Sequence, residues 1–350
     1  LRLPVTGQTM RAAVLEGAGQ VAVRDVERLS PAAGEVLVRV AYCGICGTDL
    51  HTMLDGWGTP GSVGGHEWSG EVEAVGAGVT AWRPGDHVVG GPAPCGSCRW
   101  CRDGYPALCV ADPIRTGTQG HGGAFAEYHL GPADGLRPVP AGLPLRAAAL
   151  AEPLAVALHG LTVASSVGAE VTGRVLVTGA GPLGLLVVAA LAARGAAEVV
   201  VSEPSAARRT QAMKAGASSA VAPDELPAAP ELPTQCRDDG FDVAFDCSGQ
   251  GAAIATCLSL LRPAGRLVLL GTGSMSVRFD PIRILLNELV VTGAYCYDDG
   301  GIEAALDLLA SGRLPVDSLL MPDDVRLDGL IGALHGLKSG EIPAKVLVRP

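Results

Sequence analysis

The feature that most constrains the fold is a glycine-rich turn between an expected strand and an expected helix. Residues 174–178 form a short apolar run, and residues 182–194 have the length and composition of a helix that ends before a glycine. The turn has the sequence GAGPLG and consists of Gly179, Ala180, Gly181, Pro182, Leu183 and Gly184. In such a G-x-G-x-x-G turn the first glycine permits a tight bend, the second lets the backbone approach a pyrophosphate, and the third lets the helix pack on the sheet. The segment therefore predicts a dinucleotide-binding fold, with the pyrophosphate at the helix N-terminus.

A carboxylate near this turn indicates which dinucleotide is bound. Glu203 follows the next expected strand, residues 198–202. A carboxylate at this place accepts hydrogen bonds from the ribose hydroxyls of NAD and repels the 2′-phosphate of NADP. NAD is therefore predicted over NADP, although Arg208 and Arg209 follow closely and Arg208 would meet such a phosphate. The ends of later strands are expected to line the nicotinamide end of the site, at Ser248, Gly271, Thr272, Ala294, Tyr295 and Cys296.

The hydrophobic pattern divides the chain into two kinds of structure. Short strands dominate up to about residue 150, whereas helices and buried strands alternate afterwards, which predicts a parallel sheet covered on both faces. The predicted fold class is α/β, with a mostly-β domain over residues 10–153, a doubly wound domain over 154–294, and a return to the first domain over 295–350. The four prolines between residues 222 and 239 predict an irregular connection. Residues 1–9 are expected to be an extension that precedes the fold.

Four cysteines form the strongest metal-binding pattern. Cys95, Cys98, Cys101 and Cys109 lie in one loop, residues 92–112, that also contains Gly and Pro. Thiolates with such short spacings bind zinc tetrahedrally, with Zn–S distances near ~2.3 Å. The alternative is a set of buried or disulfide-paired cysteines, which suits an exported chain, but the N-terminal residues do not read as an export signal. Four thiolates leave no open position on the ion, so this zinc is predicted to be structural.

The composition excludes several classes of protein. The 350 residues include 26 Lys and Arg against 36 Asp and Glu, which gives a formal net charge of −10 at pH 7. A nucleic-acid partner is not expected, because binding one requires a basic patch. No apolar run reaches the ~18 residues that cross a bilayer, so no membrane partner is expected either. The chain is expected to be a cytoplasmic globular protein with a small-molecule ligand.

A third constellation consists of Cys46, His66 and Glu152. Each residue alone is unremarkable, but Cys46 lies in the sequence GICGTDLH and His66 in GHEWSG. The second segment and the residues that follow match the zinc signature of the zinc-containing medium-chain alcohol dehydrogenases, at Gly65, His66, Glu67, Gly70, Gly76 and Val79. The chain resembles this family over essentially residues 10–350, because the cysteine loop and the glycine turn also follow in the family's order.

The resemblance implies a GroES-like catalytic domain and a Rossmann domain, with the active site in the cleft between them. It places a catalytic zinc on Cys46, His66 and Glu152. Polyol and threonine dehydrogenases carry Glu where this chain has Glu152, whereas the alcohol dehydrogenases that oxidise ethanol carry Cys. Within the polyol branch Glu67 can ligate instead, with Glu152 reaching zinc through a water, and the sequence leaves this choice open.

The resemblance also implies roles for residues around the metal. Thr48 and His51 would relay the proton to solvent, and the less favoured alternative for His51 is an ordinary solvent-facing histidine. Asp49 would bind the free nitrogen of His66, and Lys345 would pair with the cofactor pyrophosphate. Members of this branch are usually homotetramers, so a homotetramer or homodimer is expected.

These residues together predict an oxidoreductase with two zinc ions per chain and NAD. A zinc with three protein ligands polarises an alcohol oxygen in its open position, and NAD accepts the hydride. A carboxylate ligand donates less charge than a second thiolate and leaves a stronger Lewis acid, which favours secondary hydroxyls of polyols, sugars or cyclitols and gives ketones. Alternatives are a threonine-like amino alcohol or a simple secondary alcohol. A non-catalytic protein that kept the fold would be expected to lose ligands or the relay, and all are present.

Overall fold

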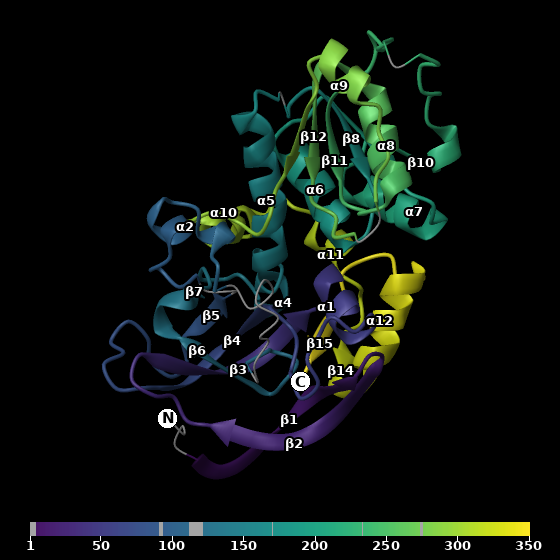
Figure 1. The fold of residues 1–350 in the computed structure, drawn as a ribbon. Coiled ribbons are helices and arrows are strands. Elements are labelled where there is room, and N and C mark those ends of the chain that lie inside the picture. The colour runs from purple at the N-terminus through teal and green to yellow at the C-terminus, as the bar shows by residue number, and fades with distance from the viewer. Residues whose placement is uncertain (1–4, 91–93, 112–121, 170, 233, 274–275) are drawn as a thin grey trace.

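The computed structural model describes residues 5–90, 94–111, 122–169, 171–232, 234–273 and 276–350. The chain builds two β-sheets with helices around them, joined through the long helix α5 (Ala151–Ser166). Figure 1 shows one sheet in the lower half of the molecule and the other in the upper half, with α5 running between them. Among the described residues, no helix is long and apolar enough to cross a membrane.

The lower sheet has seven strands in the order β14-β15-β3-β4-β5-β7, with β6 pairing on β3. The strands are β3 (Glu35–Gly44), β4 (Glu67–Val75), β5 (His87–Gly90), β6 (Tyr128–Pro132), β7 (Leu136–Pro138), β14 (Val325–Arg326) and β15 (Leu347–Arg349). The last strand, β15, pairs antiparallel with β3, so the end of the chain lies beside the strand that leads to Cys46. Two short helices, α1 (Gly47–Met53) and α4 (Leu145–Ala148), and the longer α12 (Leu330–Ser339) belong to this half.

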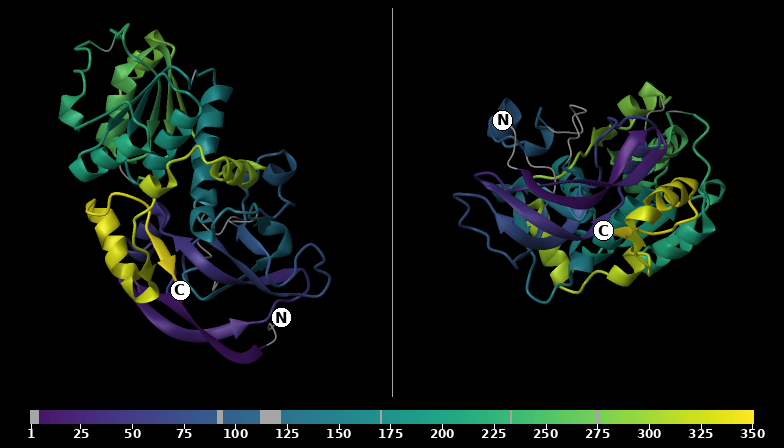
Figure 2. Two further views of the ribbon diagram at one scale, coloured as in Figure 1. Left: turned by 180° about the vertical axis from the view of Figure 1, so that it is seen from behind. Right: turned by 90° about the horizontal axis from the view of Figure 1, so that it is seen from below.

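A two-stranded ribbon of β1 (Val5–Gly17) and β2 (Gln20–Leu29) runs along the outside of this half, as Figures 1 and 2 show. Residues 5–9 are part of β1, so the expectation that residues 1–9 precede the fold is wrong for them. Their pairing with β2 extends the ribbon, because Val5 lies opposite Leu29 and Thr9 opposite Glu27.

The upper sheet has six strands, all parallel, in the order β10-β9-β8-β11-β12-β13. The strands are β8 (Arg174–Thr178), β9 (Glu198–Ser202), β10 (Ser219–Val221), β11 (Phe241–Asp246), β12 (Leu261–Leu269) and β13 (Val290–Gly293). This is the 3-2-1-4-5-6 order of the Rossmann fold, so the predicted fold class is confirmed. The middle residues of the two central strands, 175–177 of β8 and 243–245 of β11, are apolar and fully buried because helices cover both faces of the sheet.

The helices of the upper half are α6 (Pro182–Ala193), α7 (Ala206–Ala215), α8 (Gly251–Leu260) and α9 (Pro281–Leu286). Helix α10 (Gly301–Ala310) packs on α5, and α11 (Val316–Leu319) packs on α7. The described residues between Ala222 and Asp239 form one short 3-10 turn, Pro223–Glu225, and otherwise irregular chain, as the prolines predicted. One hydrophobic core, which includes Leu154, Leu186 and Leu306, joins the upper sheet to α5 and α10.

Candidate active site

Three side chains that could bind a metal ion meet beside the start of α1. Cys46 directly precedes this helix, His66 directly precedes β4, and Glu67 is the first residue of β4. One ligand atom of each lies within 4.8 Å of the other two. Glu67 is buried, whereas Cys46 and His66 are partly exposed. The structure therefore places Glu67 in this group of three, which does not include Glu152.

The pairing of β3 with β4 fixes the position of Glu67. Gly44, the last residue of β3, lies opposite Glu67 in the sheet. A Cβ at Gly44 would lie only 2.3 Å from Glu67 Oε2. Glycine is needed at this point because the carboxylate crosses directly over the backbone of the neighbouring strand.

Lys345 lies against Glu67 and not at the cofactor turn. Its Nζ is 2.7 and 2.6 Å from the two carboxylate oxygens of Glu67, and it donates a hydrogen bond of 2.9 Å to the Ile45 carbonyl. Burial lowers the pKa of Lys345, but the negative charges of Glu67, Cys46 and Glu152 and the hydrogen bonds to Glu67 together outweigh it and raise that pKa. The expectation that Lys345 binds the pyrophosphate is therefore wrong, because its ammonium is enclosed by Glu67 and the backbone.

Glu152 and Asp49 add negative charge to the group of three. Glu152 lies in the first turn of α5, and burial raises its pKa to about 7. Asp49 Oδ2 accepts a hydrogen bond of 2.8 Å from the Cys46 amide, and its Oδ1 lies 3.9 Å from His66 Nδ1. Burial lowers the pKa of His66, but Cys46, Asp49 and Glu152 outweigh it and raise that pKa well above its usual value. A partly buried site with these anionic donors fits a divalent cation such as zinc.

The two expected relay residues lie on α1. Thr48 Oγ1 is 3.5 Å from His66 Nε2, so Thr48 stands at the metal-binding group. His51 Nδ1 is 2.9 Å from Asp55 Oδ2, and its Nε2 is 3.4 Å from the carbonyl oxygen of Thr272 in the upper half of the molecule. The sequence analysis missed Asp55, although its i, i+4 spacing from His51 is a signal that could have found it.

The four-cysteine loop fits a second zinc ion. Its described part, residues 94–111, holds helix α2 (Arg99–Arg102) and a 3-10 turn, and the four sulfurs lie within 4.8 Å of one another. The Cys98 and Cys101 sulfurs are 3.5 Å apart, and those of Cys95 and Cys101 are 4.0 Å apart. Tetrahedral coordination at a Zn–S distance of about 2.3 Å requires sulfurs ~3.8 Å apart. Hydrogen bonds from Ser97 and the Cys98 amide lower the pKa of Cys95 to about 6, which favours the thiolate that zinc needs.

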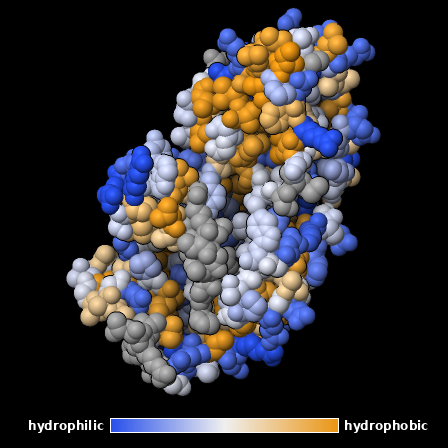
Figure 3. Space-filling model, viewed as in Figure 1, coloured by the Kyte–Doolittle hydropathy of each residue, from blue (hydrophilic) through white to orange (hydrophobic). Residues whose placement is uncertain are grey.

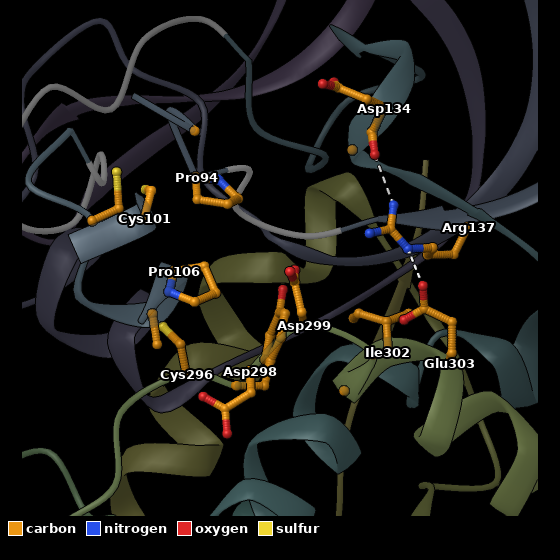
Figure 4. A pocket seen from close by; sticks show the side chains of 17 residues that line it. Pro94, Cys101, Pro106, Asp134, Arg137, Cys296, Asp298, Asp299, Ile302 and Glu303 are labelled. Carbon is orange, nitrogen blue, oxygen red and sulfur yellow. Dashed lines mark hydrogen bonds and ion pairs between the residues drawn. The ribbon is translucent and has the colours of Figure 1, made fainter. Parts of the chain in front are cut away.

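A cavity of about 320 Å³ lies beside this loop, between it, residues 134–137, and the chain segment 296–303 (Figure 4). Arg137 forms an ion pair with Glu303 on its wall and donates to the Asp134 carbonyl at 2.7 Å. Cys296, which was expected at the nicotinamide end, lines this cavity. Among the described residues that line it, none belongs to the group of three.

The glycine turn has the conformation that its sequence predicted. Gly179 has a φ of 86°, which only glycine adopts without strain, and Gly181 caps the N-terminus of α6, which begins at Pro182. Leu183 and Gly184 form the first turn of the helix, and a Cβ at Gly184 would lie 1.9 Å from the Gly179 carbonyl oxygen. The first amides of α6 have no hydrogen-bond acceptor within the helix, so they are available to an anion at its N-terminus.

Glu203 lies beside this turn. Its two oxygens accept hydrogen bonds from the Ala180 amide at 2.8 Å and the Ser205 amide at 2.9 Å. Glu203 therefore also braces the turn, a role that the sequence analysis did not foresee. The carboxylate retains lone pairs for a ribose hydroxyl, because each oxygen accepts one hydrogen bond from these two amides.

Arg208 does not stand free beside Glu203. Its guanidinium donates to the carbonyls of Leu337 at 2.8 Å and Ile342 at 3.3 and 3.4 Å, at the end of α12 in the lower half. The Ser205 hydroxyl contacts the Gly340 carbonyl in the same place. The expectation that Arg208 would meet a cofactor phosphate is therefore wrong in this structure, because its donors join the two halves of the molecule.

The ends of β8 and β11 meet around a carboxylate that the sequence analysis missed. Asp246 is fully buried and accepts hydrogen bonds from the Thr178 hydroxyl at 2.9 Å, the Ser248 hydroxyl at 2.6 Å and the Gly249 amide at 2.9 Å. A Cβ at Gly179 would lie 3.0 Å from that of Ser248. Asp246 thus ties the loop after β11 to the glycine turn. The same edge of the sheet carries the remaining expected positions, Gly271 and Thr272 after β12, and Ala294 and Tyr295 after β13.

Comparison with known proteins identifies the family. Residues 32–141 match the model of the alcohol dehydrogenase GroES-like domain, and residues 182–311 match that of the zinc-binding dehydrogenase domain. The chain belongs to the zinc-containing medium-chain dehydrogenases, a family of oxidoreductases, within its polyol- and threonine-dehydrogenase-like branch.

Individual relatives carry different names. The chain is 32% identical over 355 residues to D-xylulose reductase A of Aspergillus oryzae, covering 97% of this chain and 96% of the relative. It is 37% identical over 307 residues to L-threonine 3-dehydrogenase of Pyrococcus abyssi, covering 85% and 86%. A solved structure from Sinorhizobium meliloti 1021, described as a zinc-binding dehydrogenase bound to NADP, is 30% identical with a TM-score of 0.84, covering 98% and 100%.

Proposed function

We propose that this protein oxidises a secondary hydroxyl of a polyol, sugar or cyclitol to a ketone, with zinc and NAD. The observation that carries the proposal is the group Cys46, His66 and Glu67, with Glu152 buried nearby and the relay residues on the adjoining helix. The two zinc sites fit one catalytic ion and one structural ion per chain. A threonine-like amino alcohol is the second candidate, because an L-threonine 3-dehydrogenase is among the relatives.

The side chains at the metal-binding group have separate roles in the proposed reaction. Cys46 and His66 would hold the catalytic zinc with Glu67 or Glu152, and the bound ion would supply Lewis acidity toward the alcohol oxygen while NAD accepts the hydride. Asp49 fixes the amide of Cys46 and contacts His66, and so orients two of the ligands. Thr48 lies at the metal-binding group and His51 at the domain boundary, so the proton would pass from Thr48, by way of a ribose hydroxyl or a water, toward His51.

The nucleotide domain would bind the cofactor through its backbone and one carboxylate. The amides at the start of α6 would bind the pyrophosphate. Glu203 supports a preference for NAD, because a 2′-phosphate beside this carboxylate would be repelled and Arg208 is already engaged by Leu337 and Ile342. Because the solved relative is bound to NADP, the test of this preference is a comparison of kcat/KM with NAD and with NADP.

A homodimer or homotetramer would form through the open edge of the upper sheet. Strand β13 ends the sheet, and exposed apolar side chains occur on it and on α9, at Ile282, Leu285, Leu286 and Val291. Figure 3 shows hydrophobic surface gathered over this half of the molecule. An open edge beside apolar surface favours pairing with a second copy across a twofold axis. Light scattering after size exclusion would measure the mass, and a monomer at micromolar concentration would contradict this part of the proposal.

The ten cysteines form no disulfide, which suits a reducing compartment such as the cytoplasm.

A substrate panel followed by NADH absorbance tests the function. The panel contains vicinal diols, sugar alcohols, cyclitols, threonine and ethanol, each with NAD and with NADP. We expect the highest kcat/KM for a secondary hydroxyl flanked by another hydroxyl, and loss of activity in chelator that zinc restores. Best activity with ethanol would refute the polyol assignment, and best activity with threonine would establish the second candidate.

A further inference from the structure

The imidazole of His51 is held on three sides. Its Nδ1 lies 2.9 Å from Asp55 Oδ2, and its Nε2 lies 3.4 Å from the Thr272 carbonyl oxygen. The indole of Trp57 stacks on its face, with ring centroids 4.6 Å apart and an angle of 19° between the planes. Asp55 and Trp57 belong to the lower half of the molecule, as His51 does, whereas Thr272 belongs to the upper half.

The loop after α1 brings both neighbours onto the ring. The amides of Asp55 and Trp57 donate to the His51 carbonyl at 3.2 and 3.1 Å, so the chain folds back over the end of the helix. Gly56 between them has a φ of 84°, which permits the reversal. The contacts of His51 with Asp55 and Trp57 are therefore built into the local fold.

Asp55 is an ionised acceptor. Lys338 of α12 donates to its Oδ1 at 2.5 Å, and the hydrogen bonds from Lys338 and His51 lower the pKa of Asp55. Among the described residues, Asp55 and Lys338 are the charged groups in contact with the ring or with its partner. A carboxylate accepts hydrogen bonds, so the ring nitrogen facing it, Nδ1, carries a hydrogen.

The other ring nitrogen then faces a second acceptor. In the neutral ring with a hydrogen on Nδ1, Nε2 has a lone pair, and the Thr272 carbonyl opposite offers another. In the protonated ring both nitrogens donate, and the contacts with Asp55 and Thr272 are both satisfied. With Nδ1 donating to Asp55, Nε2 can therefore donate to the Thr272 carbonyl only while the ring carries a second proton.

We propose that Asp55 is a positioning residue for His51, which it holds by Nδ1 so that Nε2 is the atom that gains and loses the proton. While it carries the proton, His51 donates from Nε2 to the Thr272 carbonyl and so bridges the two domains. This inference rests on the proposed function for the origin of the proton, which leaves the alcohol as it is oxidised. The neutral ring takes up that proton at Nε2, becomes an imidazolium, and returns to neutral when water removes it.

The opposite charges of Asp55 and Lys338 allow an experiment in which two variants shift the midpoint of His51 protonation in opposite directions. Asp55→Asn removes the negative charge beside the ring and keeps the side-chain shape, so the protonated form of His51 loses stabilisation. Lys338→Met removes a positive charge and leaves the carboxylate, so the protonated form gains. A general loosening of the loop would move both variants in the same direction.

Emission from Trp57 reports the protonation without any substrate, because a protonated imidazole in contact with an indole quenches it. The measurement is fluorescence against pH on the full protein, with Trp57→Phe to identify the signal and Asp328→Asn as a control. Asp328 is an exposed carboxylate paired with Arg11 at 2.9 Å. We expect the midpoint to fall by about 1 pH unit in Asp55→Asn, to rise by less in Lys338→Met, and to stay unchanged in Asp328→Asn.

Three results would overturn the inference. The first is a wild-type emission without a pH titration that belongs to Trp57, and the second is an equal midpoint in wild type and Asp55→Asn. The third is a shift of the same sign in Asp55→Asn and Lys338→Met. Turnover provides the second measurement. With saturating alcohol and NAD, kcat of Asp55→Asn should fall about 10-fold while the KM for NAD stays constant. If the wild type oxidised no alcohol but the midpoints moved as expected, the proposed function would fail and the positioning role of Asp55 would stand.

Discussion

Replacing Lys345 by Met tests how the buried charges around the metal site are balanced. The change keeps the length of the side chain but removes the ammonium that lies 2.6 and 2.7 Å from the Glu67 oxygens. The two side chains are only 3% and 1% exposed, so water does not replace the lost partner. Breaking a buried ion pair from one side costs about 3–5 kcal/mol. We expect the metal-free variant to lose about this much of its free energy of unfolding.

Zinc should change that result. A divalent cation bound beside Cys46, His66 and Glu67 supplies positive charge where Lys345→Met removed it. The zinc-loaded variant should therefore lose only about 1 kcal/mol, the upper value for an ion pair whose charges are compensated by their surroundings when the pair is broken, as water does at a surface. The remaining 2–4 kcal/mol is a linkage free energy, so the variant should bind this zinc roughly 30- to 700-fold more tightly than the wild type.

Urea unfolding of metal-free and zinc-loaded protein measures the loss in the free energy of unfolding. Zinc titration against a competing chelator measures the change in zinc affinity. The four-cysteine loop is the same in both proteins, so its zinc cancels in the comparison. Lys214→Met on the exposed face of α7 is the control and should change neither quantity. The double variant Glu67→Gln with Lys345→Met should recover part of the lost stability, because no buried charge is left unpaired. Equal destabilisation with and without zinc, or weaker zinc binding, would refute the reasoning.

The other predictions concern the second zinc, acid stability, the cofactor and the substrate. Cys98→Ser should reduce the zinc content from about two ions to about one per chain and lower Tm, as measured by elemental analysis and calorimetry. Burial lowers the pKa of His129 to about 4, so a falling pH protonates this histidine first in the unfolded state. The free energy of unfolding should therefore fall by up to about 3 kcal/mol as the pH drops from about 6.5 to 4, as measured by urea unfolding. An equally steep fall in His129→Leu would contradict this. Glu203→Ala should weaken NAD use by about 1.5–3 kcal/mol in kcat/KM and improve NADP use; a wild type that prefers NADP would show the assignment of Glu203 to be wrong. Glu152→Cys should keep the zinc and lower kcat/KM for the best polyol, and unchanged kinetics would show that Glu152 does not act at the metal.

Local patterns predicted most of the fold. The strand, glycine turn and helix over residues 174–194 have strong signals at one place in the chain, and the structure has them there. The four cysteines are equally local, because a loop of that length cannot separate them far. The irregular connection after β10 followed from its prolines, whose rings cannot continue a helix. Short-range rules therefore predicted these three features correctly, because each depends on residues that are near in sequence.

Long-range pairing is where the sequence analysis failed. Lys345 was assigned to the pyrophosphate by resemblance, but the pairing of β15 with β3 carries it to Glu67, 278 positions earlier. Arg208 was read beside Glu203, its neighbour in sequence, but its donors reach carbonyls more than a hundred residues later. Periodicity and spacing contain no information about such contacts, because they depend on how the two sheets are placed.

The placement of the two sheets also brings one short segment into contact with three separate parts of the molecule. In residues 337–345, the carbonyls of Leu337 and Ile342 accept from Arg208 in the nucleotide domain, Lys338 binds Asp55 beside the relay histidine, and Lys345 binds Glu67 at the metal. Each contact is a charged hydrogen bond, which is directional and lost within about an ångström of displacement. A movement of the end of α12 would therefore disturb the metal ligand, the relay and the domain contact together. The segment carries none of the motifs by which the sequence resembles a zinc dehydrogenase, yet it contacts Glu67 at the metal-binding group and Asp55 beside His51.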